Sequence, residues 1–123
     1  MPANLRLLVV DDEEITGKRL RTALEKAGYA VEVLQSGRAA IERLQEQEFD
    51  IVITDIRMDD VDGLDVLEAV QKHSSRTKTI LITGYATAEV ARGALAKGAF
   101  DLIAKPFKPK DLRKAIEKAA RAL

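Results

Sequence analysis

Residues 5–14 read LRLLVVDDEE, a short apolar run that ends in four acidic residues. A run of this length, rich in Leu and Val, is typical of a strand that is covered on both faces of a parallel sheet. Similar runs follow at residues 30–34, 51–54, 79–83 and 102–104. Between these runs, and after the last one, apolar residues recur at helical spacing, as at Leu20, Ala23, Leu24 and Ala27. The sequence therefore predicts five strand–helix units.

Strict alternation of strands and helices predicts an α/β fold with a parallel sheet, right-handed crossovers and helices on both faces. Local signals agree: Gly28 follows the first helical segment, Thr87 can cap the fourth, and Pro109 suits the first turn of the fifth. No linker interrupts the chain, so we expect a single domain over residues 1–123. Ligands of such folds bind beyond the carboxyl ends of the strands.

The composition is that of a globular protein and excludes several classes of site. Hydrophobic residues make up 46% and charged residues 33%, and the absence of cysteine excludes disulfide frameworks and thiolate metal sites. The longest apolar run, Leu7 to Val10, is too short to cross a bilayer, and acidic residues follow it too early for a secretory signal. We therefore expect a cytoplasmic protein without membrane association.

Positive charge gathers toward the end of the chain, although the net charge is zero. From Lys105 onward there are seven Lys or Arg residues against two Asp or Glu. Such a segment can contact nucleic acid, but cations also suit a solvated helix near its carboxyl end. No recognition motif accompanies the charge, so we favour the solvated helix and expect no direct nucleic-acid binding.

Polar residues stand at the expected strand ends, where side chains from separate strands meet. Asp11 and Asp12 follow the first strand and Asp55 the third, while Thr83 ends the fourth strand and Lys105 follows the fifth. Carboxylates this close repel one another and stay ionised together only beside a cation. Oxygen ligands without Cys or His select a hard cation such as Mg²⁺. One carboxylate could then attack phosphorus, while the hydroxyl and the ammonium bind the remaining phosphoryl oxygens.

Four sequence fragments together resemble the response-regulator receiver family. They are VVDDE (9–13), ITDIRM (53–58), LITG (81–84) and GAFDLIAKPF (98–107), and the similarity extends over about residues 5–123. The resemblance implies a flavodoxin-like fold, with a five-stranded parallel sheet in the order 2-1-3-4-5 between two layers of helices. It also implies a switch in two-component signalling and not a conventional enzyme.

The resemblance implies a role for each acidic residue at the strand ends. Asp55 would accept a phosphoryl group from a histidine kinase or a phosphotransfer protein. Asp12 would bind Mg²⁺ or Mn²⁺ directly, and Asp11 would bind it through water. Asp55 itself and the backbone carbonyl of Arg57 would complete the protein ligands of the ion.

The resemblance also implies how the signal leaves the site. Thr83 and Lys105 would hold the phosphoryl oxygens, with a cis peptide bond between Lys105 and Pro106. The fourth helix, fifth strand and fifth helix would form the output surface, to which a downstream effector or a second copy of the chain binds. Candidate ion-pair residues there are Arg92, Lys97, Asp101, Arg113 and Glu117. The GAFD segment also resembles receivers joined to transcriptional activators, so we expect either a stand-alone regulator or the receiver of a longer protein.

Two positions depart from the family pattern. Asp59 stands where the family usually has proline, and with Asp60 and Asp62 it adds negative charge near the expected site. These acids could attract a cation, but we favour the interpretation that they begin the third helix. Leu102 replaces the usual Tyr or Phe, so we do not expect the usual coupling between Thr83 and an aromatic ring at that position.

Two bulky side chains flank the expected phosphoryl site. Tyr85, two residues after Thr83, is a candidate for part of the switching role of the absent aromatic residue. Arg57 lies two residues after Asp55. Together, Arg57 and Tyr85 are expected to obstruct the water that hydrolyses an acyl phosphate, which predicts a long-lived phosphorylated state.

Four other interpretations of the sequence compete with this one. Asp11 and Asp12 could serve only to cap the first helix. The chain could be a phosphorylation-independent interaction module, which Leu102 and Asp59 favour and the acidic cluster opposes. A flavin-binding protein would need a Gly, Ser and Thr loop after the first strand, and a small phosphatase would need a second acid where Arg57 stands. We therefore disfavour both of these last two classes.

Overall fold

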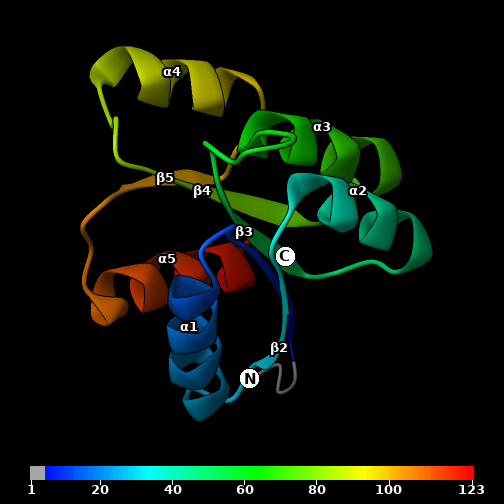
Figure 1. Ribbon diagram of the computed structural model, residues 1–123, viewed down its shortest axis with the longest axis vertical. Helices are drawn as coiled ribbons and strands as arrows, with labels where there is room; N and C mark the ends of the chain where they lie inside the picture. Colours follow the sequence, from blue (N-terminus) through cyan, green and yellow to red (C-terminus); the bar gives the residue numbers. More distant parts are fainter. Residues whose placement is uncertain (1–4) are drawn as a thin grey trace.

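The structure, a computed structural model, describes residues 5–123 as five strand–helix units (Figure 1). The strands are β1 (Arg6–Val10), β2 (Ala30–Leu34), β3 (Ile51–Asp55), β4 (Lys78–Thr83) and β5 (Asp101–Ala104). The helices are α1 (Glu14–Lys26), α2 (Gly37–Glu46), α3 (Gly63–His73), α4 (Ala88–Ala96) and α5 (Pro109–Arg121). Within residues 5–123, none of these helices has the length and apolar composition needed to cross a bilayer.

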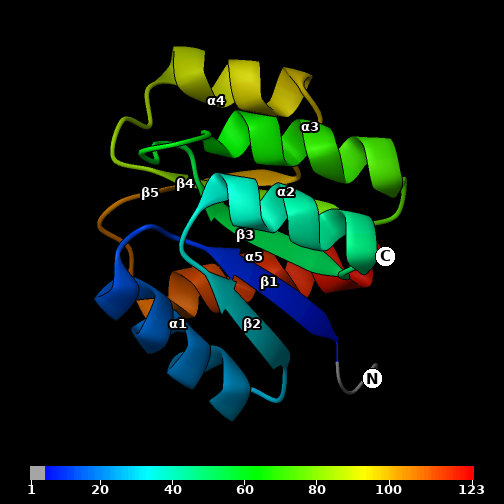
Figure 2. The ribbon, with the colours of Figure 1, turned by 45° about the vertical axis from the view of Figure 1, so that its right-hand side comes forward.

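The sheet is parallel, with the strand order β2-β1-β3-β4-β5. Helices α1 and α5 cover one face and α2, α3 and α4 cover the other, which gives three layers (Figure 2). The expected strand order and flavodoxin-like architecture are therefore confirmed. The register pairs Asp55 with Ile82 of β4 and Thr83 with Ala104 of β5, so the carboxyl ends of these strands lie at one edge.

Successive residues of the central strands pack into separate cores. In β1, Leu7 and Val9 belong to the core under α1 and α5, whereas Leu8 and Val10 belong to the core under α2 and α3. Every residue of β3 is buried. This burial on two sides explains the continuous apolar runs of the sequence, because each strand presents hydrophobic side chains to both layers of helices.

The ends of three helices follow local signals in the sequence. Thr87 caps α4 by accepting the Val90 N–H at 3.1 Å, and α5 begins at Pro109. Gly28, with φ at 100°, lies two residues past the end of α1 in the left-handed region that favours glycine. These three predictions are confirmed, and each depends on contacts within a few residues of the helix end.

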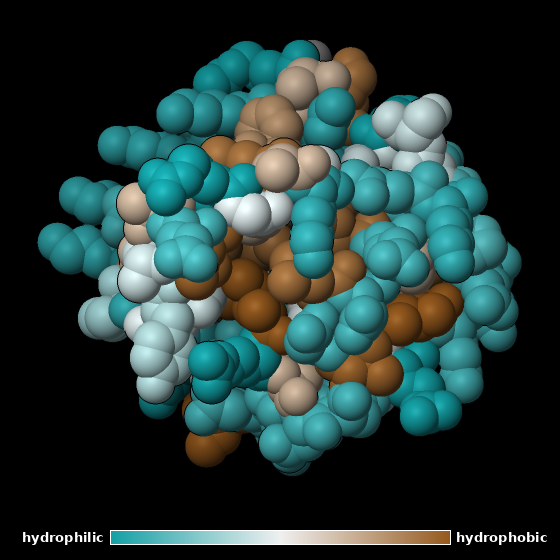
Figure 3. Space-filling model, turned by 90° about the horizontal axis from the view of Figure 1, so that it is seen from above, coloured by the Kyte–Doolittle hydropathy of each residue, from teal (hydrophilic) through white to brown (hydrophobic). Residues whose placement is uncertain are grey.

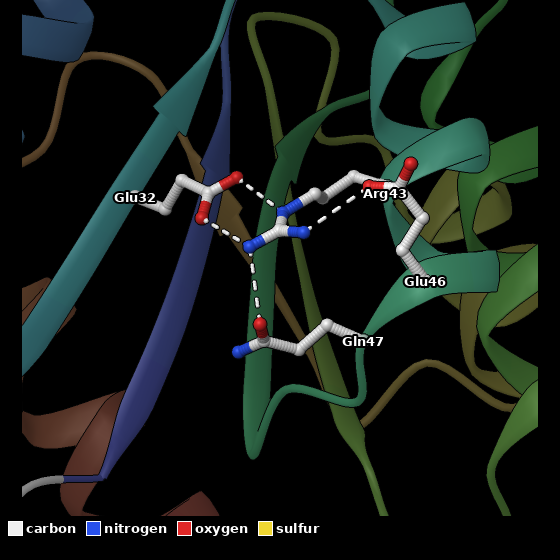
Figure 4. Close-up of polar contacts among 4 residues, drawn as sticks. All are labelled: Glu32, Arg43, Glu46 and Gln47. Carbon is white, nitrogen blue, oxygen red and sulfur yellow. Dashed lines mark hydrogen bonds and ion pairs between the residues drawn. The ribbon is translucent and has the colours of Figure 1, made fainter.

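An ion-pair network fixes α2 to the edge strand β2 (Figure 4). Arg43 donates to both carboxylate oxygens of Glu32, at 2.8 and 3.1 Å, and also donates to Glu46 and Gln47. A guanidinium that forms two bonds to one carboxylate restrains orientation as well as distance. Because Leu44 of the same helix is buried, α2 is held both at its side and on its inner face.

Candidate functional site

Three carboxylates meet at the carboxyl edge of the sheet. Asp11 and Asp12 follow β1 and Asp55 ends β3, and each offers an oxygen within 4.8 Å of the other two. Asp11 and Asp55 are buried, with exposed fractions of 2% and 7%. Asp11 accepts the Glu13 N–H at 2.8 Å, and Glu13 itself is the N-cap of α1. Neither Asp11 nor Asp12 is therefore the N-cap of α1.

Lys105 joins the cluster from the end of β5. Its ammonium donates to Asp55 Oδ2 at 2.5 Å, although the two residues are 50 positions apart in the chain. The peptide bond between Lys105 and Pro106 is cis, as the resemblance implied. The sheet thus brings together the three acids and the lysine that the sequence analysis placed at one site.

Burial and charge act in opposite directions on these ionisable groups. Burial raises the pKa of Asp55, and the hydrogen bond and charge of Lys105 offset only part of this rise. Burial likewise raises the pKa of Asp11, against the hydrogen bond from the Glu13 backbone. Burial alone would lower the pKa of Lys105, but the hydrogen bond and charge of Asp55 outweigh it and the pKa is raised. Three carboxylates beside one ammonium give the site a net negative charge when all of these groups are ionised.

The donor set fits a hard divalent cation. The three carboxylates supply only oxygen, which Mg²⁺ prefers and Mn²⁺ accepts. The chain has no cysteine, and its one histidine, His73, ends α3. The other end of α3, at Gly63, lies against the backbone of Asp55. His73 is therefore a helix length away from the acidic cluster. Softer metals that need sulfur or imidazole ligands are not favoured here.

Thr83 adds a hydroxyl to the same edge. It ends β4, is 3% exposed, and pairs with Ala104, the residue before Lys105. Its Oγ1 accepts the Tyr85 N–H at 3.0 Å, which leaves the hydroxyl proton free to donate to another group. Thr83, at the end of the strand next to Asp55, and Lys105, directly after β5, are therefore neighbouring donors at this edge of the sheet.

Arg57 and Tyr85 lie against each other at the rim of the site. The guanidinium carbon of Arg57 is 4.5 Å from the centre of the Tyr85 ring. Leu102, by contrast, is partly buried against an apolar cluster formed by Leu67, Leu81, Ala94 and Ala99. The two residues considered for switching, Tyr85 and Leu102, therefore occupy different surroundings.

The acids after β3 have different structural roles. Asp62 caps α3 by accepting two N–H groups of its first turn, as expected. Asp60 instead accepts the N–H groups of Gly37 and Arg38 at the start of α2. The prediction that Asp60 begins α3 is therefore wrong. This contact was not predicted, because it depends on the path of a loop past α2, for which a single sequence gives no signal.

Two residues expected on the surface of α4, β5 and α5 lie elsewhere. Arg113 lines a groove between α1 and α5, together with Arg19 and Lys26 of α1. Glu117, one turn further along α5, lies near Tyr29, whose pKa is raised by burial and by the charge of Glu117. The expectation for Arg113 and Glu117 is therefore wrong, whereas the other three candidates lie in or next to α4 and β5.

Comparison with known proteins agrees with this geometry. Residues 7–117 match the family described as the response regulator receiver domain. The chain belongs to this family. Receiver domains bind Mg²⁺ at an acidic pocket, and this chain has an acidic cluster formed by Asp11, Asp12 and Asp55.

Relatives and solved structures extend the comparison. Regulatory protein AtoC of Escherichia coli (strain K12) is 38% identical over 119 residues, which are 97% of this chain and 26% of AtoC. Response regulator receiver protein CpdR of Brucella abortus (strain 2308) is 35% identical over 113 residues, 92% of this chain and 94% of CpdR. A CheY-like receiver domain protein from Methanospirillum hungatei has a TM-score of 0.90 at 31% identity, covering 98% of this chain and 97% of that one.

Some of these relatives are much longer than this chain. The chain spans about a quarter of the length of AtoC and of transcriptional regulatory protein ZraR of Escherichia coli (strain K12), which is 36% identical over 94% of this chain. The chain is thus a receiver domain of a two-component response regulator, similar to the receivers of transcriptional regulators. Receiver domains of this kind are typically not catalytic enzymes.

Proposed function

We propose that Asp55 accepts a phosphoryl group with the help of a divalent cation, and that residues 1–123 form the one receiver domain that this reaction switches. The observation that best supports the proposal is the setting of Asp55, a buried carboxylate beside two further acids and bonded to the Lys105 ammonium. Such a cluster is costly without a cation, because buried carboxylates lose hydration and repel one another. Residues 1–4 of this domain lie outside the described residues.

The proposed ion is Mg²⁺ or Mn²⁺. Asp12 and Asp55 bind it directly, Asp11 binds it through water, and the backbone carbonyl of Arg57 supplies a further oxygen. When bound, a divalent ion neutralises charge on the phosphoryl oxygens that the carboxylate approaches. The short separation of the three carboxylates supports this assignment, because one ion can contact oxygens that lie within 4.8 Å of one another.

The transfer moves one phosphoryl group from a donor to the chain. A carboxylate oxygen of Asp55 forms a bond to phosphorus, and the bond from phosphorus to the donor breaks with its electron pair remaining on the donor. The donor is the phosphohistidine of a histidine kinase or phosphotransfer protein, or a small acyl phosphate. Thr83 and Lys105 bind the transferred oxygens, which requires Lys105 to exchange the Asp55 carboxylate for a phosphoryl oxygen. The chain assists its own modification and its own dephosphorylation only.

Thr83 connects the site to the loop before α4. Because the Thr83 hydroxyl accepts the Tyr85 N–H, a Thr83 side chain that turns toward a phosphoryl group either breaks this bond or draws the Tyr85 backbone with it. Tyr85 thereby takes part in switching, while Leu102 has no ring to turn inward. Structures with and without a phosphoryl mimic test this role, and an unchanged Tyr85 and Leu102 in both would refute it.

The output surface is formed by α4, β5 and α5. Ala94 is the one buried residue of α4, and an element with few buried contacts can shift at low cost. Leu95 of α4 is 51% exposed, and the face seen from above α4 has an apolar area framed by polar side chains (Figure 3). A downstream effector binds this surface, or a second copy binds it in a phosphorylation-dependent homodimer. Charged residues at its edge that steer specificity are Arg92, Lys97 and Asp101.

Exposure to a phosphodonor tests the proposal. The purified protein and Asp55→Asn are incubated with acetyl phosphate, with and without Mg²⁺, and their intact masses are compared. We expect the mass of one added phosphoryl group in the wild type with Mg²⁺, and none in the variant. A wild type that stays unlabelled with Mg²⁺ contradicts the proposal.

A phosphorylation-independent interaction module is the second candidate function. Leu102 favours it, because its place in an apolar cluster leaves no aromatic switch at this position. One measurement separates the two candidates. A phosphorylation-independent module binds its partner with the same affinity in three samples: the untreated wild type, the wild type treated with the phosphodonor, and Asp55→Asn.

A further inference from the structure

One carboxylate fastens the loop between β3 and α3 to the first turn of α2. Asp60 Oδ1 accepts the Gly37 N–H at 3.2 Å, and Asp60 Oδ2 accepts the Arg38 N–H at 3.0 Å. These N–H groups have no partner within the helix and lie at the positive end of its dipole. Ser36, the N-cap of α2, accepts the next one, from Ala39, at 2.9 Å. The start of α2 is thus capped both by its own serine and by a distant loop.

The contact between this loop and α2 is close. The hydrogen bond from the Arg38 backbone, with others from the Val61 and Gly37 backbones, lowers the pKa of Asp60 to about 2. Asp60 is therefore ionised at neutral pH, and both of its oxygens act as acceptors. A Cβ at Gly37 would overlap the Val61 carbonyl, so the backbone of the loop lies directly against the helix.

The residues before Asp60 are also held. Met58 packs against the core between the sheet, α2 and α3. The Gly63 N–H donates to the Ile56 carbonyl at 2.7 Å and closes the loop where α3 begins. The Arg57 peptide lies between Ile56 and Met58, inside this closed loop, so its orientation depends on how the loop is anchored.

The anchor on α2 is itself fixed. Arg43 ties the helix to Glu32 of β2, and Leu44 is buried. An acceptor bonded to such a helix restrains the loop that carries it, because neither partner can move alone without breaking both hydrogen bonds.

We infer that Asp60 is a positioning residue for the divalent-cation site. By binding the first N–H groups of α2, it holds the loop so that the Arg57 carbonyl is in place before the ion arrives. This inference rests on the proposed function, in which that carbonyl is a ligand of the ion. Affinity is higher for a ligand set in place beforehand, because binding does not have to order the loop.

Binding of Mn²⁺, followed by electron paramagnetic resonance, tests the inference, because the signal of the free ion falls as the ion binds. Asp60→Ala removes both hydrogen bonds and is expected to weaken Mn²⁺ binding roughly tenfold, the usual loss when an outer partner of a metal ligand is removed. Asp60→Asn keeps one acceptor oxygen, so its affinity should lie between those of Asp60→Ala and the wild type. Asp60→Asn also serves if Asp60→Ala does not fold.

Two matched variants separate positioning from stability and from charge. Ser36→Ala removes the other cap of α2 and lowers stability, but it leaves the loop attached, so the Mn²⁺ affinity should stay at the wild-type value. Asp59→Asn removes one negative charge, as Asp60→Asn does, but from the exposed residue next to Asp60. It should weaken Mn²⁺ binding less than Asp60→Asn does.

Each outcome bears on the inference. Wild-type affinity in Asp60→Ala overturns it and leaves the proposed function intact. Equal losses in Ser36→Ala and Asp60→Ala, or in Asp59→Asn and Asp60→Asn, also overturn it, because stability or charge then explains the effect. A wild type that binds no Mn²⁺ and takes up no phosphoryl label overturns the proposed function, and the inference with it.

Discussion

The guanidinium of Arg57 rests on the ring of Tyr85, and this contact joins the loop after β3 to the loop after β4. A cation over an aromatic face is attracted by the ring, weakly where the groups are exposed. Tyr85 is 61% exposed, so the pair forms a rim and not part of the core. Because Asp55 and Thr83 each lie two residues earlier in the chain, the rim borders the proposed phosphoryl site.

Removal of this rim is expected to shorten the life of the phosphorylated protein. Water must reach phosphorus opposite the Asp55 oxygen, and the double variant Arg57→Ala with Tyr85→Ala opens that approach. We expect dephosphorylation to become roughly tenfold faster, which corresponds to a barrier lower by about 1.4 kcal/mol. The loss of label is followed by mass spectrometry after the phosphodonor is removed. Leu95→Ala, on the exposed face of α4, should decay like the wild type, and an unchanged or slower double variant counts against shielding.

The bond from Asp60 to α2 predicts a dependence of stability on pH. The folded-state pKa of about 2 lies below the unfolded value of about 3.9. The contribution of this carboxylate is therefore fully present above about pH 4 and is lost as the pH falls through about 2. Urea unfolding of the wild type and Asp60→Asn across this range measures it. The difference in unfolding free energy should shrink toward pH 2, and a constant difference would show that the charge of Asp60 has no part in it.

The buried hydroxyl of Thr79 is the basis for predicting that Thr79→Val stabilises the fold. Thr79 is 2% exposed, and within residues 5–123 its hydroxyl has no hydrogen-bond partner. Thr79→Val replaces this hydroxyl with a methyl group of similar size and should raise the unfolding free energy by about 1–2 kcal/mol. Thr54→Val is the matched control, because the buried Thr54 hydroxyl donates to the Asp55 carbonyl at 3.0 Å and its loss should be destabilising. Equal effects of the two substitutions on stability would contradict the assignment.

Mg²⁺ is expected to stabilise the wild type more than a protein with an incomplete acid cluster. At a concentration one hundred times its dissociation constant, a ligand of the folded state alone adds about 2.7 kcal/mol. Asp12→Asn relieves repulsion, so it should unfold at a higher temperature than the wild type without Mg²⁺ and gain less from added Mg²⁺. Thermal unfolding followed by circular dichroism over a Mg²⁺ series measures both effects. Glu117→Gln, on α5, should respond to Mg²⁺ like the wild type.

The sequence was sufficient to predict contacts that follow from the fold class. Asp55 and Lys105 are far apart in the chain, yet their meeting at one site was predicted because the carboxyl ends of parallel strands share one edge. The caps formed by Thr87 and Asp62 were predicted because capping acts within one turn.

Other contacts depend on geometry that one sequence does not contain. The bond from Asp60 to the start of α2 requires the path of a loop over a helix that precedes it by many residues. Arg113 was assigned to the wrong side of α5, because polar residues flank the buried stripe of a helix on both sides. The apolar spacing shows which face is buried, but not which neighbouring helix lies beside each flank.

The most direct test of the central claim is to locate the phosphoryl group. Protein treated with acetyl phosphate and Mg²⁺ is reduced with borohydride, which converts an aspartyl phosphate to homoserine, and its peptides are sequenced by mass spectrometry. We predict homoserine at position 55 in the sample with Mg²⁺ and unmodified aspartate there without it. Conversion at Asp11 or Asp12 in place of Asp55, or no conversion in a folded protein saturated with Mg²⁺, would contradict the account.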